Sequence, residues 1–345
     1  MFSAMFSIFL IPFIFAMFLA INMGGSGTSP SFSAAYGANL IRKDLIPGLF
    51  GIFVFLGAII AGKNVSLTVG KSILPSDVMG LTLTSIILLS VALSLLLANL
   101  MKIPQSTSQA TITALVGPAL YFDILKTHKL FYEIIPAWFI LPIIAFMITF
   151  FIGKFIYSPV KKRGFINFTQ IAAHPVLKAL VLLASFYVAF AIGANNVANA
   201  SGPIASMLSN ELNIAPTDDN FLLIMIAATL IIAPCFAIGS SIFGHGVVQT
   251  TGKEIIDFGP MAAVLVACTT ATLLILASVT RGIPTSLVQM NIFAIIGLGV
   301  SQTGWSNILH KTSIKKLFTV WMIAPIISLA ISYVLTYASV QIGWL

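Results

Sequence analysis

The sequence carries very little charge. Of its 345 residues, 17 are Lys or Arg and nine are Asp or Glu, so 8% are charged while 59% are apolar. A soluble domain carries roughly 25% charged residues to solvate its surface. This scarcity excludes a soluble enzyme. A nucleic-acid-binding protein is excluded as well, because the basic residues stand singly or in small groups at the ends of apolar runs instead of forming a patch.

Cysteine and long polar stretches are also scarce. Cys235 and Cys268 lie inside apolar runs without a CxxC spacing or a histidine partner, so we expect small hydrophobic residues and no redox site. No polar block exceeds about 20 residues, which leaves no room for an appended soluble domain. The first run, Met1 to Asn22, lacks the charged start of a signal peptide, and we expect it to be a first transmembrane segment.

Long apolar runs fill the rest of the chain. A helix needs roughly 17–25 residues to cross a bilayer, and the runs predict five crossings on each side of a polar central loop. The predicted crossings are 7–22, 45–62, 79–101, 106–124, 130–157, 175–193, 220–239, 261–280, 285–302 and 317–340. Two of them, 106–124 and 285–302, are short and rich in Ser, Thr, Gln or Gly. We expect an all-α polytopic protein of the cell membrane.

The two halves of the chain share landmarks in the same order. Three of these recur at offsets of 182, 183 and 180 residues: Gly57 with Gly239, Trp138 with Trp321, and Gln109 with Gln289. The pattern predicts a tandem duplication, with a first repeat at 1–157, a basic linker at 158–174 and a second repeat at 175–345. An odd number of crossings in each half would insert the second repeat upside down, as in many secondary transporters.

Basic residues in the loops predict the orientation in the membrane. The central loop carries Lys161, Lys162 and Arg163, so the positive-inside rule places it in the cytoplasm. Counting five crossings outward in each direction then places both termini outside. Lys126 and Lys129 also fall outside in this count, against the rule.

Residues that a lipid-facing helix avoids occur at corresponding places in the two halves. The segments 24–31 and 193–203 are rich in Gly, Ser or Asn, and irregular backbone at membrane depth survives only where protein or water satisfies it. We therefore predict two broken or re-entrant helices at the midplane, which is the sequence signature of a transport site.

Helix-capping residues follow each predicted break. Ser29 before Pro30 predicts one helix start, Asn195 or Asn196 a second, and hydroxyl residues at the beginning of the two short segments a third and a fourth. Four helix N-termini would form an anion site from hydrogen-bond donors. The candidate substrate-binding residues are Ser26, Thr28, Ser29, Ser106, Thr107, Gln109, Asn195, Asn196, Asn199, Thr285, Ser286 and Gln289. The other interpretation is that the hydroxyls only let helices pack closely.

At this point the sequence resembles a known family. Residues 193–200 read GANNVANA, which is similar to GANDVANA, the signature of the inorganic phosphate transporter family of cation-coupled symporters. The family has one copy of the signature in each half, and 24–30 occupies the place of the first. Its Pro-x-Ser-Thr motif is matched at 104–107 and partly at 284–286. The resemblance covers nearly the whole chain and implies inverted repeats, an oxyanion site at the midplane and a homodimer.

Two departures from the family bear on the substrate. Where the family has an Asp in each signature, carried there as a cation ligand, this chain has Gly27 and Asn196. Sulfate at neutral pH has no proton to donate, so its site needs only hydrogen-bond donors. Hydrogen phosphate carries a proton and binds better where the site also offers an acceptor such as a carboxylate. The segments 23–27 and 34–37 also resemble the sulfate permease branch of the family. We therefore predict a symporter for sulfate, with phosphate as the alternative.

The same residues also bear on the coupling ion and on the alternative classes of membrane protein. Without the two carboxylates we expect a proton gradient to drive uptake more readily than sodium, although neutral oxygens can also bind sodium. His245 is a candidate proton carrier. Lys102 and Arg281 stand just before the paired prolines, where they either attract a dianion or snorkel to the interface. No cofactor, metal site or catalytic constellation is expected, and an anion channel is the rival class.

Overall fold

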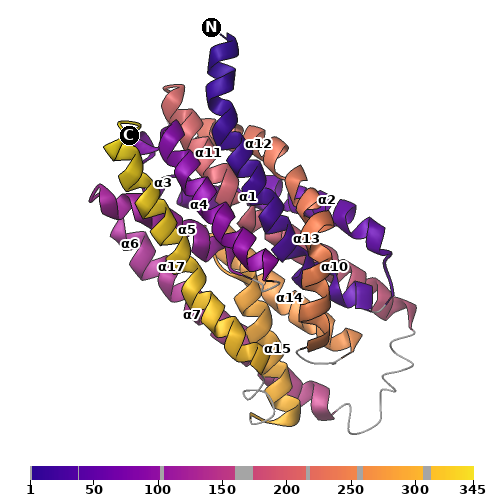
Figure 1. Cartoon of the computed structure of the whole chain (residues 1–345). Helices are drawn as coiled ribbons and strands as arrows, with labels where there is room; N and C mark the ends of the chain where they lie inside the picture. The colour runs from indigo at the N-terminus through magenta and orange to yellow at the C-terminus, as the bar shows by residue number, and fades with distance from the viewer. Residues whose placement is uncertain are drawn as a thin grey trace.

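The structure is a computed structural model that describes residues 2–37, 39–101, 105–159, 174–214, 218–254, 259–305 and 312–345, and its regular elements in these ranges are helical (Figure 1). The first half contains α1 (Phe2–Gly37), α2 (Ile46–Ala61), α3 (Lys63–Lys71), α4 (Leu81–Leu100), α5 (Thr107–Tyr121), α6 (Thr127–Lys129) and α7 (Ile135–Ile152). The second half contains α10 (Pro175–Asn196), α11 (Ala198–Glu211), α12 (Asp218–Ile232), α13 (Pro234–Glu254), α14 (Pro260–Leu276), α15 (Leu287–Thr303) and α17 (Thr312–Gln341). Turns of π-helix extend α7 at both ends (Leu130–Ile134, Gly153–Tyr157) and α14 at its C-terminal end (Ala277–Arg281).

Eight helical segments in the described ranges are long and apolar enough to cross a membrane. They are Phe9–Gly37, Lys43–Ala61, Leu81–Leu100, Thr127–Tyr157, Pro175–Glu211, Asp219–Gly244, Met261–Arg281 and Trp321–Gln341. The multi-pass helical fold is thus confirmed, and eight of the ten predicted crossings coincide with segments of this kind. The two short segments form α5, with 15 residues, and α15, with 17, and both fall short of the roughly 20 residues of a full crossing. Each packs against the helix before it, as the hairpins α4–α5 and α14–α15.

The first predicted break is absent, because α1 continues through it. Pro30 lies inside the helix instead of at its start, and the Thr28 hydroxyl donates to the Gly24 carbonyl four residues earlier, at 2.7 Å. Hydroxyl groups that bond back to their own helix remain satisfied away from water. The predictions of a broken first helix and of a helix start at Ser29 are therefore wrong.

Glycines in this part of α1 serve close helix packing. A Cβ atom at Gly24 would overlap the carbonyl of Phe236 in α13, and one at Gly239 in α13 would overlap the carbonyl of Ile21. Small residues allow this backbone-to-backbone approach, which supplies much of the packing energy between helices in a membrane.

The second predicted break is present but brief. One residue, Val197, separates α10 from α11, and no side chain caps the start of α11. The prediction that Asn195 or Asn196 caps this helix is wrong. The junction lies near the middle of the 37-residue segment Pro175–Glu211.

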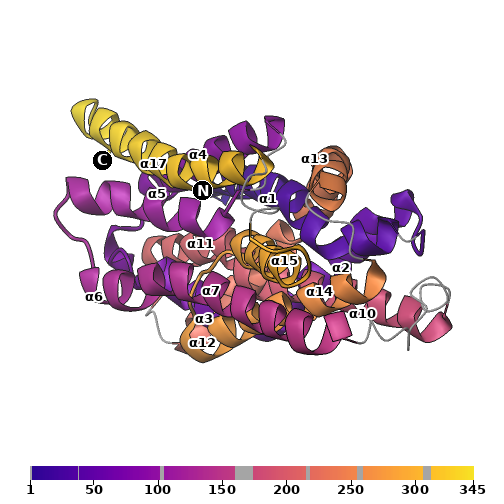
Figure 2. The same cartoon turned by 90° about the horizontal axis from the view of Figure 1, so that it is seen from below.

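The closest helix pairs are related by exchange of the two halves. α1 packs on α13 as α10 packs on α2, and α5 packs on α17 as α15 packs on α7. In Figure 1, α1 descends from the labelled N-terminus, whereas α10 begins at the lower right and leads up to α11. Figure 2 shows α17 and α7 on opposite sides of the bundle, with α15 between them.

Several predicted features lie outside the described residues. They are the loop residues Lys161, Lys162 and Arg163, together with Lys102, Pro104 and the side chain of His245. The boundaries 1–157, 158–174 and 175–345 and the orientation in the membrane therefore stay predictions.

Packing between α2 and α10 also depends on glycine and can be tested. A Cβ atom at Gly57 would overlap the carbonyl of Phe190 in α10, so Gly57→Ala must push the helices apart. We expect a loss of about 1–3 kcal/mol, the usual cost of overpacking, seen as a lower apparent melting temperature in detergent. Gly48→Ala on the same helix is the control, because nothing lies within 4 Å of its Cβ position. Equal melting temperatures for the two variants would contradict the close packing.

Candidate functional site

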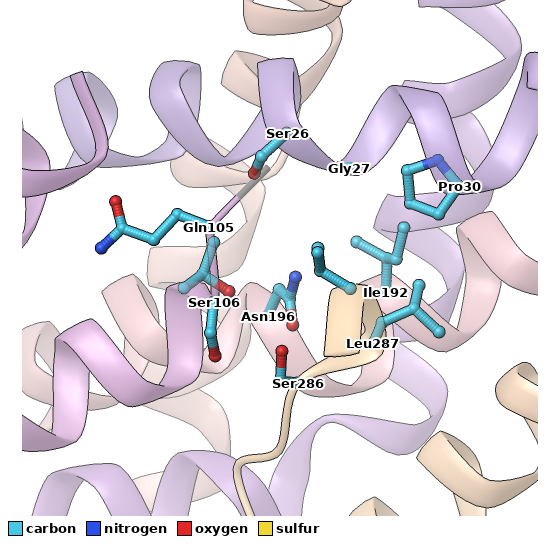
Figure 3. A pocket seen from close by; sticks show the side chains of 11 residues that line it. Ser26, Gly27, Pro30, Gln105, Ser106, Ile192, Asn196, Ser286 and Leu287 are labelled. Atoms are coloured by element: carbon cyan, nitrogen blue, oxygen red, sulfur yellow. The ribbon is translucent and has the colours of Figure 1, made fainter. Parts of the chain in front are cut away.

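A small cavity lies where the tips of the two hairpins meet α1 and α10. It is lined by Ser26, Gly27, Pro30, Gln105, Ser106, Thr107, Ile192, Asn196, Ser286, Leu287 and Val288. Figure 3 shows Asn196 between Ser106, at the start of α5, and Ser286, at the start of α15. Both halves of the chain thus contribute to one cavity.

The lining is polar but neutral. Its polar side chains are hydroxyls and amides, and none of the lining residues is acidic or basic. Hydroxyl and amide groups can donate hydrogen bonds to an anion without competing negative charge. Such a lining suits an anion whose charge is balanced by oriented donors.

Two helix starts lie at the cavity, as predicted. The Ser106 hydroxyl accepts from the backbone N–H of Gln109 at 3.3 Å, and the Ser286 hydroxyl accepts from that of Gln289 at 3.2 Å. Because the caps themselves line the cavity, the other free N–H groups of both first turns and both positive dipole ends are close to it. The sequence predictions for these two of the four helix starts are confirmed.

A pair of glutamines joins the two hairpins. Gln109 Nε2 donates to Gln289 Oε1 and Gln289 Nε2 donates to Gln109 Oε1, both at 3.0 Å. Both side chains are buried. Since these residues correspond to each other in the repeat, equivalent positions of the two halves meet here. Each side-chain amide forms hydrogen bonds with the other.

Asn195 holds the tip of the second hairpin. Its Nδ2 donates to the Ser278 hydroxyl at 2.8 Å and to the Ile283 carbonyl at 3.1 Å. Its Oδ1 accepts from the Ser108 hydroxyl at 3.1 Å and from the backbone N–H of Thr285 at 3.3 Å. The side chain is fully buried, and its amide is engaged on both ends by protein groups.

Oxygens without partners stand near this network. Asn196 Oδ1, Asn199 Oδ1 and Thr285 Oγ1 are buried and have no hydrogen-bond partner, while Asn199 Nδ2 donates to the Ser108 hydroxyl at 3.3 Å. A buried polar atom left unpaired costs about 1–3 kcal/mol. These atoms therefore mark places where a ligand, an ion or water is expected, and of the three residues Asn196 lines the cavity.

The predicted site residues divide between the lining and its surroundings. Those in the lining are Ser26, Ser106, Thr107, Asn196 and Ser286. Those outside the lining are Thr28, Ser29, Gln109, Asn195, Asn199, Thr285 and Gln289. The assignment of all twelve to substrate binding stays a prediction.

The sequence analysis missed Gln105 and the apolar part of the lining. Gln105 Nε2 donates to the Ser94 hydroxyl at 3.0 Å, and Ser94 donates to the Ala324 carbonyl of α17 at 3.1 Å. The repeat offset of 180 residues aligns Gln105 with Thr285, so a polar residue precedes the cap in both halves. That correspondence could have identified Gln105, whereas nothing distinguishes the apolar lining residues from other core positions.

Comparison with known proteins identifies the family of the chain. A model of the phosphate transporter family matches residues 23–332. The chain belongs to the phosphate transporter family. It is 34% identical over 324 residues to the sulfate permease CysP of Bacillus subtilis, covering 93% of this chain and 85% of that protein. A protein of Pyrococcus abyssi whose name describes it as a phosphate permease is 23% identical over 388 residues, covering 91% and 93%.

A solved structure shares the fold. A sodium-dependent phosphate transporter superposes with a TM-score of 0.83 at 22% identity, covering 97% of this chain and 100% of that one. Membership of the phosphate transporter family confirms the resemblance seen in the sequence. The protein is a multi-pass membrane transporter and not an enzyme, as the sequence predicts.

Asn195 has several hydrogen-bond partners whereas the side-chain oxygen of Asn196 has none, so we expect their Ala variants to differ in thermal stability. Asn195→Ala leaves the Ile283 carbonyl and the Thr285 N–H buried without these partners, at a cost of about 1–3 kcal/mol for each group. We expect a lower apparent melting temperature in detergent. Asn196→Ala removes a side chain whose oxygen has no partner and should melt like the wild type. Wild-type melting of Asn195→Ala would contradict its role in holding the hairpin.

Proposed function

We propose that the protein is a symporter that imports sulfate across the cell membrane. The neutral, donor-rich cavity around Asn196 carries this proposal. Sulfate oxygens only accept hydrogen bonds, so every contact can be met by a hydroxyl, an amide N–H or a helix N-terminus. Hydrogen phosphate also carries a proton, which is best met by a carboxylate acceptor. The similarity to a sulfate permease supports the proposal, and the phosphate permeases among the relatives make phosphate the alternative.

We assign the roles in binding as follows. Ser106 and Ser286 hold the first turns of α5 and α15 at the cavity, so that the remaining N–H groups of these turns face the anion. Asn196 presents its amide nitrogen on the side of Ser26 and its oxygen on the side of Ser286 (Figure 3). Thr107 and Asn196 are then the side-chain donors to the anion, whereas the Ser26 hydroxyl donates to the Met23 carbonyl of its own helix at 3.1 Å.

We further infer that the two halves are inverted repeats. The opposite directions of α1 and α10 in Figure 1 and the meeting of Gln109 with Gln289 support this arrangement. Transport would then move one half against the other around a fixed site. A cytoplasmic central loop, outward termini and a homodimer belong to the same proposal.

We propose a proton as the coupling ion, since the described residues place no carboxylate in the cavity lining. A specific observation favours sodium as the second candidate. The unpartnered oxygens of Asn196, Asn199 and Thr285 are neutral oxygen ligands of the kind that hard cations accept.

Asn196→Asp tests whether the missing carboxylate sets the choice of anion. The substitution keeps size and adds negative charge with a further acceptor, which a sulfate ion cannot use. We expect sulfate uptake into proteoliposomes to fall roughly ten- to hundredfold more than phosphate uptake, the equivalent of about 1–3 kcal/mol. Asn196→Ala adds no charge and should weaken the uptake of both anions. An Asp variant that folds and keeps the wild-type preference would remove the carboxylate from the account.

The double variant Gly27→Asp/Asn196→Asp extends this test to both signature positions. A Cβ atom at Gly27 would lie 3.0 Å from Phe50 Cζ, so a side chain here also costs space. Gly27→Asn is the matched control for size without charge. We expect the double variant to disfavour sulfate relative to phosphate more than the control does.

Coupling is tested by imposing each gradient alone. In vesicles loaded without sodium, an inward proton gradient should accumulate labelled sulfate above its equilibrium distribution. Accumulation that requires inward sodium and ignores the pH gradient would replace the proton by sodium. Flux that only dissipates the sulfate gradient under both conditions would identify a channel and reject the symporter.

A further inference from the structure

The first turns of α5 and α15 share one sequence pattern. A Ser at the N-cap is followed three residues later by a Gln, as Ser106 with Gln109 and as Ser286 with Gln289. This spacing is that of a capping box, in which the Ser hydroxyl accepts from the backbone N–H of the third helical residue and the side chain of that residue accepts from the backbone N–H of the Ser. The pattern therefore predicts two reciprocal hydrogen bonds at each helix start.

One of the two predicted bonds forms in each box. The Gln109 N–H donates to the Ser106 hydroxyl at 3.3 Å, and the Gln289 N–H donates to the Ser286 hydroxyl at 3.2 Å. The side-chain amides of the two glutamines bond to each other instead, with both nitrogen–oxygen distances at 3.0 Å. In the described part of the chain, nothing accepts from the backbone N–H of Ser106 or of Ser286.

The environment of the glutamine pair makes the two arrangements alternatives. The side chains of Gln109 and Gln289 are 7% and 8% exposed, and each reaches across to the other hairpin instead of back over its own N-cap. A buried amide without a partner is costly. A glutamine that lost its partner would therefore turn back to the nearest free donor, which is the N–H of the Ser in its own box.

The N–H groups left free by the open boxes belong to the cavity. Ser106 and Ser286 line it, and so do Thr107, Leu287 and Val288 in the first turns that follow the two caps. The first N–H groups of a helix have no partner within the helix and are donors to a bound anion. An open box adds the N–H of the Ser itself, so each helix start keeps one more donor than a closed box would leave.

We propose that Gln109 and Gln289 are positioning residues that keep both capping boxes open, so that the backbone N–H groups of Ser106 and Ser286 remain for the anion. The pair acts through the two helix starts and does not itself touch the anion. The inference rests on the proposed function in taking an oxyanion bound at these helix starts, and it applies to sulfate and phosphate alike. Direct contact of the glutamines with the substrate is the alternative.

Sulfate uptake into proteoliposomes tests the pair with three variants. Gln289→Met frees Gln109 to close its box on the Ser106 N–H, and Gln109→Met frees Gln289 to do the same at Ser286. Each single variant should raise KM for labelled sulfate roughly three- to tenfold, as expected for the loss of one hydrogen bond, with Vmax close to wild type. In Gln109→Met/Gln289→Met no glutamine remains to close either box, so KM should return to within about twofold of wild type.

Two results of this comparison would overturn the proposal. A double variant with a higher KM than either single variant would show that the glutamines contact the anion directly. Single variants with the wild-type KM would show that the boxes stay open without the pair. Gln302→Met on α15 is the control for the substitution itself, because Gln302 Nε2 has no partner to lose, and it should keep the wild-type KM.

A fourth variant separates an open box from mere stability of the hairpins. Gln109→Asn/Gln289→Met keeps a buried amide at 109 that is one methylene shorter than the Glu or Gln of a capping box. Its KM should be lower than that of Gln289→Met alone, although its apparent melting temperature in detergent should be no higher, since the amide lacks a partner. If KM rises wherever the melting temperature falls across all four variants, the pair only holds the hairpins together and the proposal is wrong.

Labelled phosphate separates this inference from the proposed substrate. If the wild type carries phosphate in place of sulfate, the proposed substrate fails, while a raised phosphate KM in the single variants and its recovery in the double variant still support the open boxes. If the wild type carries sulfate and this pattern is absent, the proposed substrate stands and the role of the glutamine pair is rejected.

Discussion

The tips of the two hairpins are buried inside the helical bundle, and their polar groups must be satisfied there without bulk water. The rest of the site depends on this constraint. Ser106 and Ser286 cap the helices that begin at the tips. At the second tip, Asn195 donates to the Ile283 carbonyl and accepts from the Thr285 N–H. Trp138 donates to the Pro284 carbonyl of the same tip. The hairpins are held in place by partners on other helices, and those partners are drawn from both halves of the chain.

The groups that face the cavity determine what the site can bind. They include N–H and hydroxyl donors together with an unpartnered acceptor, Asn196 Oδ1. Caps use one N–H group in each first turn, so the other N–H groups of α5 and α15 remain beside the cavity. The neutral lining adds donors without adding negative charge. We propose that an anion with acceptors only is the complement of these donors. The family resemblance implies an Asp at the positions of Gly27 and Asn196, and this chain has no carboxylate at either.

Much of this architecture could be predicted from the sequence, because it depends on period, length and repetition. Eight of the long apolar runs form helices long enough to cross a membrane, and the hydroxyl residues at the start of the two short segments form the two predicted caps. The predicted break near Ser29 failed because hydroxyls can bond back to their own helix and glycines can serve packing with α13. The role of Asn195 could not be predicted from the sequence, since its partners at 108, 278, 283 and 285 are far from it in the chain.

The central claim is that a neutral cavity of hydrogen-bond donors selects sulfate. Competition uptake in proteoliposomes tests it most directly, with labelled sulfate against equal concentrations of unlabelled sulfate, phosphate, molybdate and thiosulfate at neutral pH. The account predicts that sulfate competes strongly and phosphate weakly. Phosphate that competes as well as sulfate, or better, would contradict it.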